Sequence, residues 1–206
     1  MNLFSLDCHR REFNFTIVWE GKRYFFQSCD DSETIGDYLR AIAEAYGIRL
    51  SELEIFAGCG GPGSFTGLKS ALSFLFGLSG GNADRVRLIP TFVCYEKLFQ
   101  NGSGNFAVVL PAGIKDYYLH LTGKNPQLVD DTQLVSETSA CSVYCGERNQ
   151  MLDRLGKTYL PGQCLSQVMA DLESFDEYRG LEIFYLKSPG ITMRKEKKAG
   201  SYGKSA

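Results

Sequence analysis

Hydrophobic and polar residues alternate through much of the first thirty positions of the chain. The segments Phe13–Trp19 (FNFTIVW) and Lys22–Ser28 (KRYFFQS) follow this pattern, and Glu20-Gly21 stands between them. A period of two predicts strands with one buried face, and a two-residue polar gap predicts a tight hairpin. With the short apolar run Asn2–Asp7, the pattern predicts three consecutive strands.

Apolar residues at helical spacing follow this strand region. In Glu33–Tyr46 the residues Ile35, Leu39, Ile42 and Ala43 share one face, and Gly47 predicts the end of that helix. The pattern next predicts strands at Leu53–Gly58 and Val86–Pro90, a helix beginning near Ser64 or Thr66, and a helix at Thr91–Phe99.

A polar cluster at Asn101–Asn105 predicts a domain boundary, and the same order of elements returns after it. This repeat predicts an α/β fold of two subdomains, ribonuclease H-like or actin-like, each with a mixed five-stranded sheet and helices on both faces. The predicted domains are residues 1–100, a shortened second copy at 106–187, and a disordered tail at 188–206. The elements predicted after the boundary are strands at Phe106–Leu110, Asp116–Thr122, Gln127–Asp130 and Ser142–Cys145, helices around Thr132–Thr138 and at Leu165–Tyr178, and an edge strand at Leu181–Lys187.

Charge and cysteine content narrow the functional classes. The 206 residues carry a net charge of -2, which argues against a nucleic-acid platform or a membrane-surface protein. The basic run Arg194–Lys198 is the one feature that favours direct tRNA binding. The seven cysteines include no CxxC pair, and the chain has no signal peptide and no apolar run long enough for a membrane span. We therefore expect a reduced, cytoplasmic protein.

The glycine-rich stretch Gly58–Gly81 fails the motifs for nucleotide binding and nucleophilic catalysis. A Walker A loop would need other residues at Pro62 and Leu68. The GxGxxG match at its start is not followed by an acidic residue at the end of the next strand, and no GxSxG elbow surrounds Ser64. The two histidines, His9 and His120, lie in different predicted domains, which argues against a metal site built on a histidine pair. The sequence therefore predicts no catalytic residues, no metal and no cofactor.

The helix after these glycines is apolar on two sides. Phe65, Leu68, Leu72 and Leu75 form one stripe, and Ala71, Phe74 and Leu78 form a second. A helix that covers only its own sheet needs one stripe, so the second must be covered as well. These observations leave three explanations for the second stripe open: packing on a partner, burial inside the domain, and ligand binding. Gly67, Ser70, Ser73 and Gly77 would let a neighbouring helix approach closely.

Residues Gly61–Lys69 (GPGSFTGLK) resemble the signature of the bacterial TsaB (YeaZ) family, with Lys69 in place of the usual arginine. Three other stretches are similar to family segments. Leu3–Cys8 matches the opening strand, although Cys8-His9 replace Thr-Ser after Asp7. Val109–Tyr118 matches the start of the second domain, although Pro111 and Gly113 replace Asp and Arg. Phe184–Lys187 is similar to the closing Val-Tyr-Leu-Arg.

The resemblance implies a non-catalytic subunit of two actin-like domains. It implies a pairing with the TsaD-like transferase paralogue, which installs threonylcarbamoyl on the adenosine next to the anticodon of tRNAs reading A-starting codons. A TsaE-like ATPase would join, and tRNA would be contacted only indirectly. Because an uncovered apolar stripe would leave a large exposed patch, we expect the chain alone to form a homodimer through the helix beginning near Ser64 and the helix at Glu33–Tyr46. The implied site is a motif turn, Gly61, Pro62, Gly63 and Ser64, and a partner interface, Phe65, Thr66, Gly67, Lys69, Ser70, Ser73, Phe74 and Gly77.

The alternative is a stand-alone small-molecule kinase or acyl transferase of the actin-like class. Actin-like ATPases use an Asp with small or hydroxyl neighbours at the first turn and a glycine-rich phosphate loop in each domain. Here Asp7 is followed by Cys8-His9-Arg10, and the corresponding turn at Pro111 has no acid until Asp116. We therefore expect Asp7 to serve as a turn or capping residue rather than as a magnesium ligand.

Overall fold

Two five-stranded sheets of the same topology form the frame of the protein. The computed structural model describes residues 1–10, 12–28, 34–99, 105–161, 164–171, 175 and 177–184. The first sheet has the order β3-β2-β1-β4-β5, and the second has the order β8-β7-β6-β9-β10. The strands are β1 (Leu3–Asp7), β2 (Phe13–Trp19), β3 (Lys22–Ser28), β4 (Ile55–Cys59) and β5 (Val86–Ile89), then β6 (Phe106–Pro111), β7 (Asp116–Leu121), β8 (Gln127–Asp130), β9 (Val143–Gly146) and β10 (Thr158–Pro161).

The central strands show that the two sheets repeat one pattern. β1 pairs antiparallel with β2 and parallel with β4. In the same way, β6 pairs antiparallel with β7 and parallel with β9. The predicted α/β class with two mixed five-stranded sheets is therefore confirmed.

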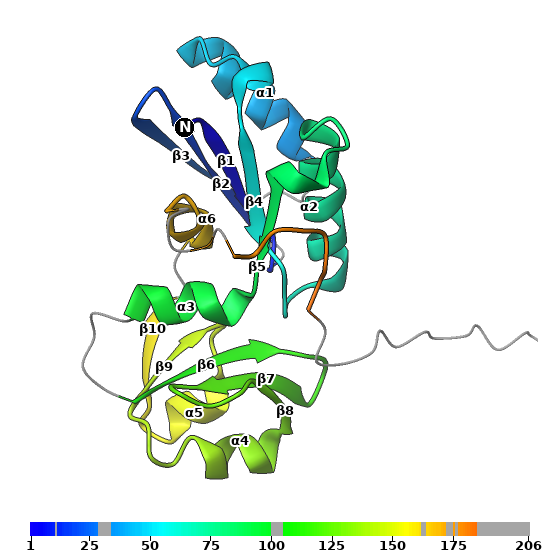
Figure 1. The fold of residues 1–206 in the computed structure, drawn as a ribbon. Coiled ribbons are helices and arrows are strands. Elements are labelled where there is room, and N and C mark those ends of the chain that lie inside the picture. Colours follow the sequence, from blue (N-terminus) through cyan, green and yellow to red (C-terminus); the bar gives the residue numbers. More distant parts are fainter. Residues whose placement is uncertain are drawn as a thin grey trace, which may run out of the picture.

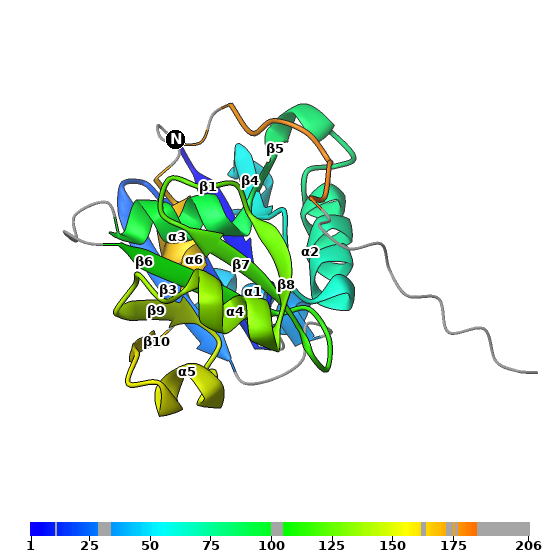
Figure 2. The same cartoon turned by 90° about the horizontal axis from the view of Figure 1, so that it is seen from below.

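Helices cover both faces of each sheet (Figure 1). On the first sheet, α1 (Ile35–Tyr46) and α2 (Phe65–Leu78) close one core, and α6 (Leu165–Met169) lies on the opposite face. α3 (Thr91–Phe99) packs between the two sheets. α4 (Asp131–Glu137) and α5 (Gln150–Arg154) cover the outer face of the second sheet, and α4 lies in front of it in Figure 2. None of the described helices is long and apolar enough to cross a membrane.

Local sequence signals account for several element boundaries. Glu20 and Gly21 both have positive φ, 48° and 77°, as a two-residue turn between β2 and β3 requires. Gly47 ends α1 in the left-handed conformation, with φ 68° and ψ 27°. Asp130 begins α4 with a capping box, in which its side chain accepts from the Gln133 backbone N–H. The sequence predicted the first two of these boundaries, whereas it predicted the helix of α4 at Thr132–Thr138, one residue away from the observed bounds at each end.

The prediction for the C-terminal part was wrong in two respects. The helix predicted at Leu165–Tyr178 ends at Met169, and residues 181–184 of the predicted edge strand Leu181–Lys187 form no strand. Instead, Arg179 forms an isolated antiparallel bridge with Arg87 of β5, so this segment borders the first sheet. The fifth strand of the second sheet is β10, a four-residue edge strand whose residues are half-buried or exposed, which is too short and too exposed for a hydrophobic alternation to reveal. The predicted tail at 188–206 lies outside the described residues.

α6 returns from the second sheet to pack on the first. Ser5 Oγ of β1 donates to the Ser166 carbonyl at 2.7 Å, and Thr16 Oγ1 lies 3.0 Å from Ser166 Oγ. Leu165 and Met169 are fully buried. The predicted domain bounds, 1–100 and 106–187, stay a prediction, but part of the second range packs against the first sheet.

Replacement of Met169 by Ala tests this docking of α6. Met169 is 0% exposed, and deletion of a buried side chain of this size costs about 2–5 kcal/mol. The matched variant Gln167→Ala changes an exposed residue of the same helix and should alter stability by no more than about 0.5 kcal/mol. Urea unfolding of both variants measures the difference, and equal stabilities would show that α6 is not docked as described.

Candidate partner-binding face and the Asp7 cluster

The motif turn Gly61–Ser64 connects β4 to α2 and is fixed by backbone hydrogen bonds. Thr91 N donates to the Gly61 carbonyl at 2.8 Å, and Ser64 N donates to the His9 carbonyl at 2.7 Å. Ser64 begins α2, because its Oγ accepts from Gly67 N at 3.2 Å. Of the two predicted N-caps, Ser64 is therefore the one that the structure uses.

The glycines of the motif allow close packing against the chain that follows β1. A Cβ atom on Gly63 would lie 2.6 Å from the His9 carbonyl oxygen, and one on Gly67 would lie 2.2 Å from the Cys8 carbonyl oxygen. Gly61 has φ 97°, which other residues rarely adopt. Intramolecular contacts therefore explain why side chains are excluded at these positions.

Burial inside the domain accounts for most of the apolar residues of α2. Ala71 and Leu75 are buried in one core, and Leu72, Phe74 and Leu78 pack at its edge. Leu68 is buried in the second core, which also contains residues of α3. The ring of Phe74 lies 6.2 Å from that of Phe4, centroid to centroid. Both predicted stripes thus face largely inward.

The remaining surface of α2 is an exposed face with aromatic residues at both ends. Phe65 is 40% exposed and Phe76 is 36% exposed. Lys69 Nζ lies 4.2 Å from the centroid of the Phe65 ring, a cation–π contact. Of the predicted interface residues, Phe65, Thr66, Lys69, Ser73 and Gly77 are exposed, Ser70 and Phe74 are half-buried, and Gly67 is buried.

We define the α2 face as the exposed residues of this helix. It adds Phe76 to the predicted set, because Phe76 is exposed and follows Phe65 by eleven residues, which places both on one side of the helix. Figure 1 shows α2 along one side of the first-sheet unit, away from the second sheet. Among the described residues, none covers the α2 face. Its members are Phe65, Thr66, Lys69, Ser73, Phe76 and Gly77.

Beneath the motif turn, the carboxylate of Asp7 is the centre of a buried polar cluster. Oδ1 accepts from His9 N at 3.1 Å and from Cys59 Sγ at 3.4 Å, and it lies 2.5 Å from His9 Nδ1. Oδ2 accepts from Asn14 Nδ2 at 3.0 Å and from Leu165 N of α6 at 3.2 Å. Asp7, His9 and Cys59 are each 2% exposed, so the cluster has almost no access to water.

Asp7 and His9 form an ion pair in this cluster. Burial by itself would raise the pKa of Asp7, but the charge and hydrogen bonds of His9, together with Asn14, hold it well below its usual range. Burial would likewise lower the pKa of His9, but the Asp7 carboxylate raises it to about 9. The hydrogen bond from His9 N agrees with the expected role of Asp7 in a turn. Asp7 also accepts hydrogen bonds from Asn14, Cys59 and Leu165, which a turn residue does not require.

His120 and Glu96 form a second polar pair, which the sequence did not indicate. His120 Nε2 lies 2.7 Å from Glu96 Oε1, and its ring stacks on Phe92 at 5.1 Å. The pair lines a pocket of about 360 Å³ between α3 and the turn after β7. Among the described residues, no Ser, Thr or Cys lines this pocket, so it offers no hydroxyl or thiol nucleophile. Asp116, at the start of β7, lies outside it.

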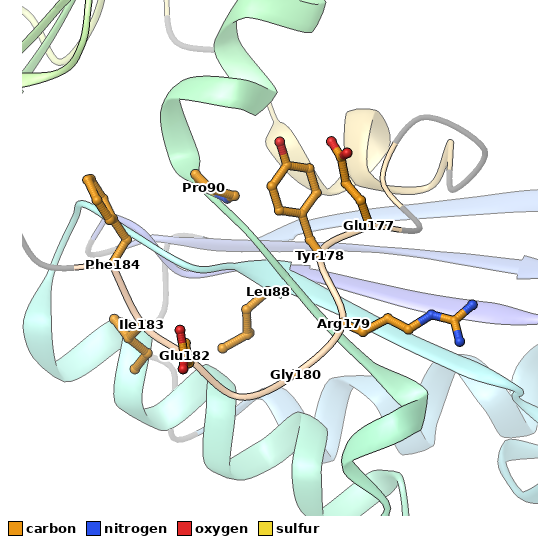
Figure 3. A pocket seen from close by; sticks show the side chains of 9 residues that line it. All are labelled: Leu88, Pro90, Glu177, Tyr178, Arg179, Gly180, Glu182, Ile183 and Phe184. Atoms are coloured by element: carbon orange, nitrogen blue, oxygen red, sulfur yellow. The ribbon is translucent and has the colours of Figure 1, made fainter.

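Residues 177–184 cross β5 and contact the motif turn. Figure 3 shows Tyr178 directed toward α3 and Arg179 directed away from it, with Leu88 beneath the segment. The pocket drawn there has a volume of about 370 Å³. Phe184 N donates to the Gly60 carbonyl at 2.6 Å, so the segment is connected to the turn that begins α2.

Comparison with solved structures identifies the fold. YeaZ from Pseudomonas aeruginosa superposes with a TM-score of 0.67 and 14% sequence identity, over 89% of this chain and 99% of that chain. The chain has the fold of YeaZ. A second structure, described as an uncharacterized protein with similarity to peptidase YeaZ from Pseudomonas aeruginosa, gives a TM-score of 0.68 at 14% identity, over 90% and 99% of the two chains. No family model and no curated protein matches the sequence.

The space around two glycines of α2 predicts opposite effects of substitution by alanine. Gly67→Ala should destabilise the protein, because its Cβ would overlap the Cys8 carbonyl in backbone that cannot easily move. Gly77→Ala should stabilise it by about 0.5–1 kcal/mol, because no atom lies within 4 Å and Ala favours the helix. Urea unfolding of the two variants should therefore give opposite signs, and the same sign would contradict this packing.

The Asp7–His9 ion pair predicts a loss of stability at alkaline pH. The pKa of His9 rises from 6.5 to about 9 in the folded protein, so its contribution is complete below about pH 6.5 and is lost as the pH rises through 9. The loss is on the order of 3 kcal/mol. Among the described residues, the ionisable groups that interact with His9 are Asp7, Cys59 and Tyr95, and Arg10 in turn interacts with Asp7 and Tyr95.

Thermal unfolding in EDTA between pH 6 and pH 10 measures this effect. His9→Gln should be less stable at pH 6 and should lose most of the alkaline decrease, whereas the control His120→Gln should keep it. An undiminished decrease in His9→Gln would contradict the assignment.

Proposed function

We propose that this chain is a TsaB (YeaZ)-type scaffold subunit that binds and activates a TsaD-like transferase through the α2 face. The assembly would install threonylcarbamoyl on the adenosine next to the anticodon. In this proposal a TsaE-like ATPase joins the assembly, the chain alone forms a homodimer through the same face, and tRNA is contacted only indirectly. The observation that carries the proposal is the α2 face itself, directly after the GPGSFTG turn in a YeaZ fold.

The chemistry of the α2 face supports a protein partner. Two exposed phenylalanines supply apolar anchors, and aromatic residues at such positions often carry much of the binding energy of an interface. Ser73 and Gly77 lie on the same face and have little or no side chain, so a partner helix can approach the backbone of α2. Lys69 adds a positive charge beside Phe65.

The buried Asp7 cluster supports a non-catalytic role for the same chain. In actin-like ATPases the acid at the first turn serves the nucleotide and its metal. Here that carboxylate accepts hydrogen bonds from His9, Asn14, Cys59 and Leu165, and it is 2% exposed. A nucleotide bound there would have to displace α6 and the ion pair. The proposal therefore assigns no nucleotide to this cluster and no catalytic residue to this chain.

Substitution of Ser73 by Arg tests the interface. Ser73 is exposed, so the variant should fold with an unchanged melting temperature. In the complex it would place an unpaired charge in a close helix contact, which costs several kcal/mol, so we expect binding to the transferase to weaken at least about 100-fold. Phe76→Ala should also weaken binding, by removal of an anchor.

The control is Ser136→Arg, an exposed serine of α4 on the outer face of the second sheet. Calorimetric titration with the transferase and sedimentation of the chain alone measure both kinds of association. The proposal fails if Ser73→Arg and Phe76→Ala are folded and still form the homodimer and the heterodimer with wild-type affinity.

A further inference from the structure

Three different metal-binding groups meet in the buried cluster below the motif turn. Asp7 ends β1, His9 follows it in the loop, and Cys59 ends β4. One carboxylate oxygen, one imidazole nitrogen and the thiol sulfur of these residues all lie within 4.8 Å of one another. Oxygen, nitrogen and sulfur from Asp, His and Cys are the donors by which proteins bind zinc.

Neighbouring groups hold these side chains as the surroundings of a metal site would. Asn14 Nδ2 and Leu165 N both donate to Asp7 Oδ2, so Oδ1 is the atom directed toward His9 and Cys59. His9 presents Nδ1 to Asp7, and its other nitrogen, Nε2, lies 3.2 Å from the Tyr95 hydroxyl. Hydrogen bonds of this kind to the far side of a ligand orient it for the metal.

We propose that Asp7, His9 and Cys59 form a zinc-binding site. The distance between Asp7 Oδ1 and Cys59 Sγ is 3.4 Å, close to the roughly 3.5 Å between such ligands in tetrahedral zinc. The 2.5 Å between Asp7 Oδ1 and His9 Nδ1 would have to lengthen to about 3.3 Å.

Zinc would enter this cluster by exchange for protons. Without metal, the Asp7 carboxylate, the His9 imidazolium and the Cys59 thiol sum to zero charge. With zinc, the ion carries two positive charges, the carboxylate and the Cys59 thiolate carry one negative charge each, and His9 is neutral. One proton leaves His9 Nδ1 and one leaves Cys59 Sγ for each ion bound. Because the three ligands and the ion again sum to zero, the exchange leaves no unpaired charge in the interior.

Cobalt is the probe that tests this site, because a thiolate bound to Co²⁺ gives a charge-transfer absorption band that zinc lacks. Because the cluster is buried, the chain is first unfolded with reductant and EDTA and is then refolded with Co²⁺. We expect one cobalt per chain after free metal is removed, the thiolate band, and a melting temperature above that of the protein refolded in EDTA.

Two serine variants give the matched comparison. Cys59→Ser should lose the cobalt and the band, whereas Cys141→Ser, which changes a buried thiol in the core of the second sheet, should keep both. If Cys59→Ser does not fold, the measurement on the wild-type protein tests the proposal by itself. A wild-type protein that retains no cobalt, or that shows no thiolate band, overturns the proposal. An unchanged band in folded Cys59→Ser overturns it too. No partner is present in these measurements, so their outcome is independent of the proposed scaffold function.

Discussion

The buried carboxylate of Asp7 is the constraint on which the arrangement of the chain depends. A charge that is 2% exposed is stable only when its oxygens are paired, and here the donors come from the loop after β1, from β2, from β4 and from α6. Leu165, 158 residues away in the sequence, supplies one of them. This requirement is one reason why α6 leaves the second sheet and packs on the first, where Ser166 makes further bonds to β1 and β2.

The same cluster links the interior to the outer surface. The loop that carries His9 accepts a hydrogen bond from Ser64, and Gly63 and Gly67 leave room for that loop. The loop after β1 therefore fixes the start of α2, and this positions Phe65 and Lys69 at the surface. In our account, this turn holds a helix in place for a partner.

Local patterns predicted most of the elements, and distant contacts explain what they missed. Three elements have the predicted bounds, because alternation and helical spacing are properties of neighbouring residues. They are β2 (Phe13–Trp19), β3 (Lys22–Ser28) and α3 (Thr91–Phe99). The replacement of Thr-Ser by Cys8-His9 was visible in the sequence, but the partners of His9 were not, since Cys59 and Tyr95 meet it only in the fold. The exposure of Phe76 likewise depends on which side of α2 faces the sheet, and that side is set by contacts with distant residues.

Hydrogen–deuterium exchange, measured by mass spectrometry on this chain with a TsaD-like transferase and separately with Mg–ATP, tests the central claim most directly. The account predicts that the transferase protects residues 65–78 and that Mg–ATP alone changes nothing around residues 5–10 and 164–169. Protection of the Asp7 region by Mg–ATP, with no effect of the transferase on α2, would contradict it.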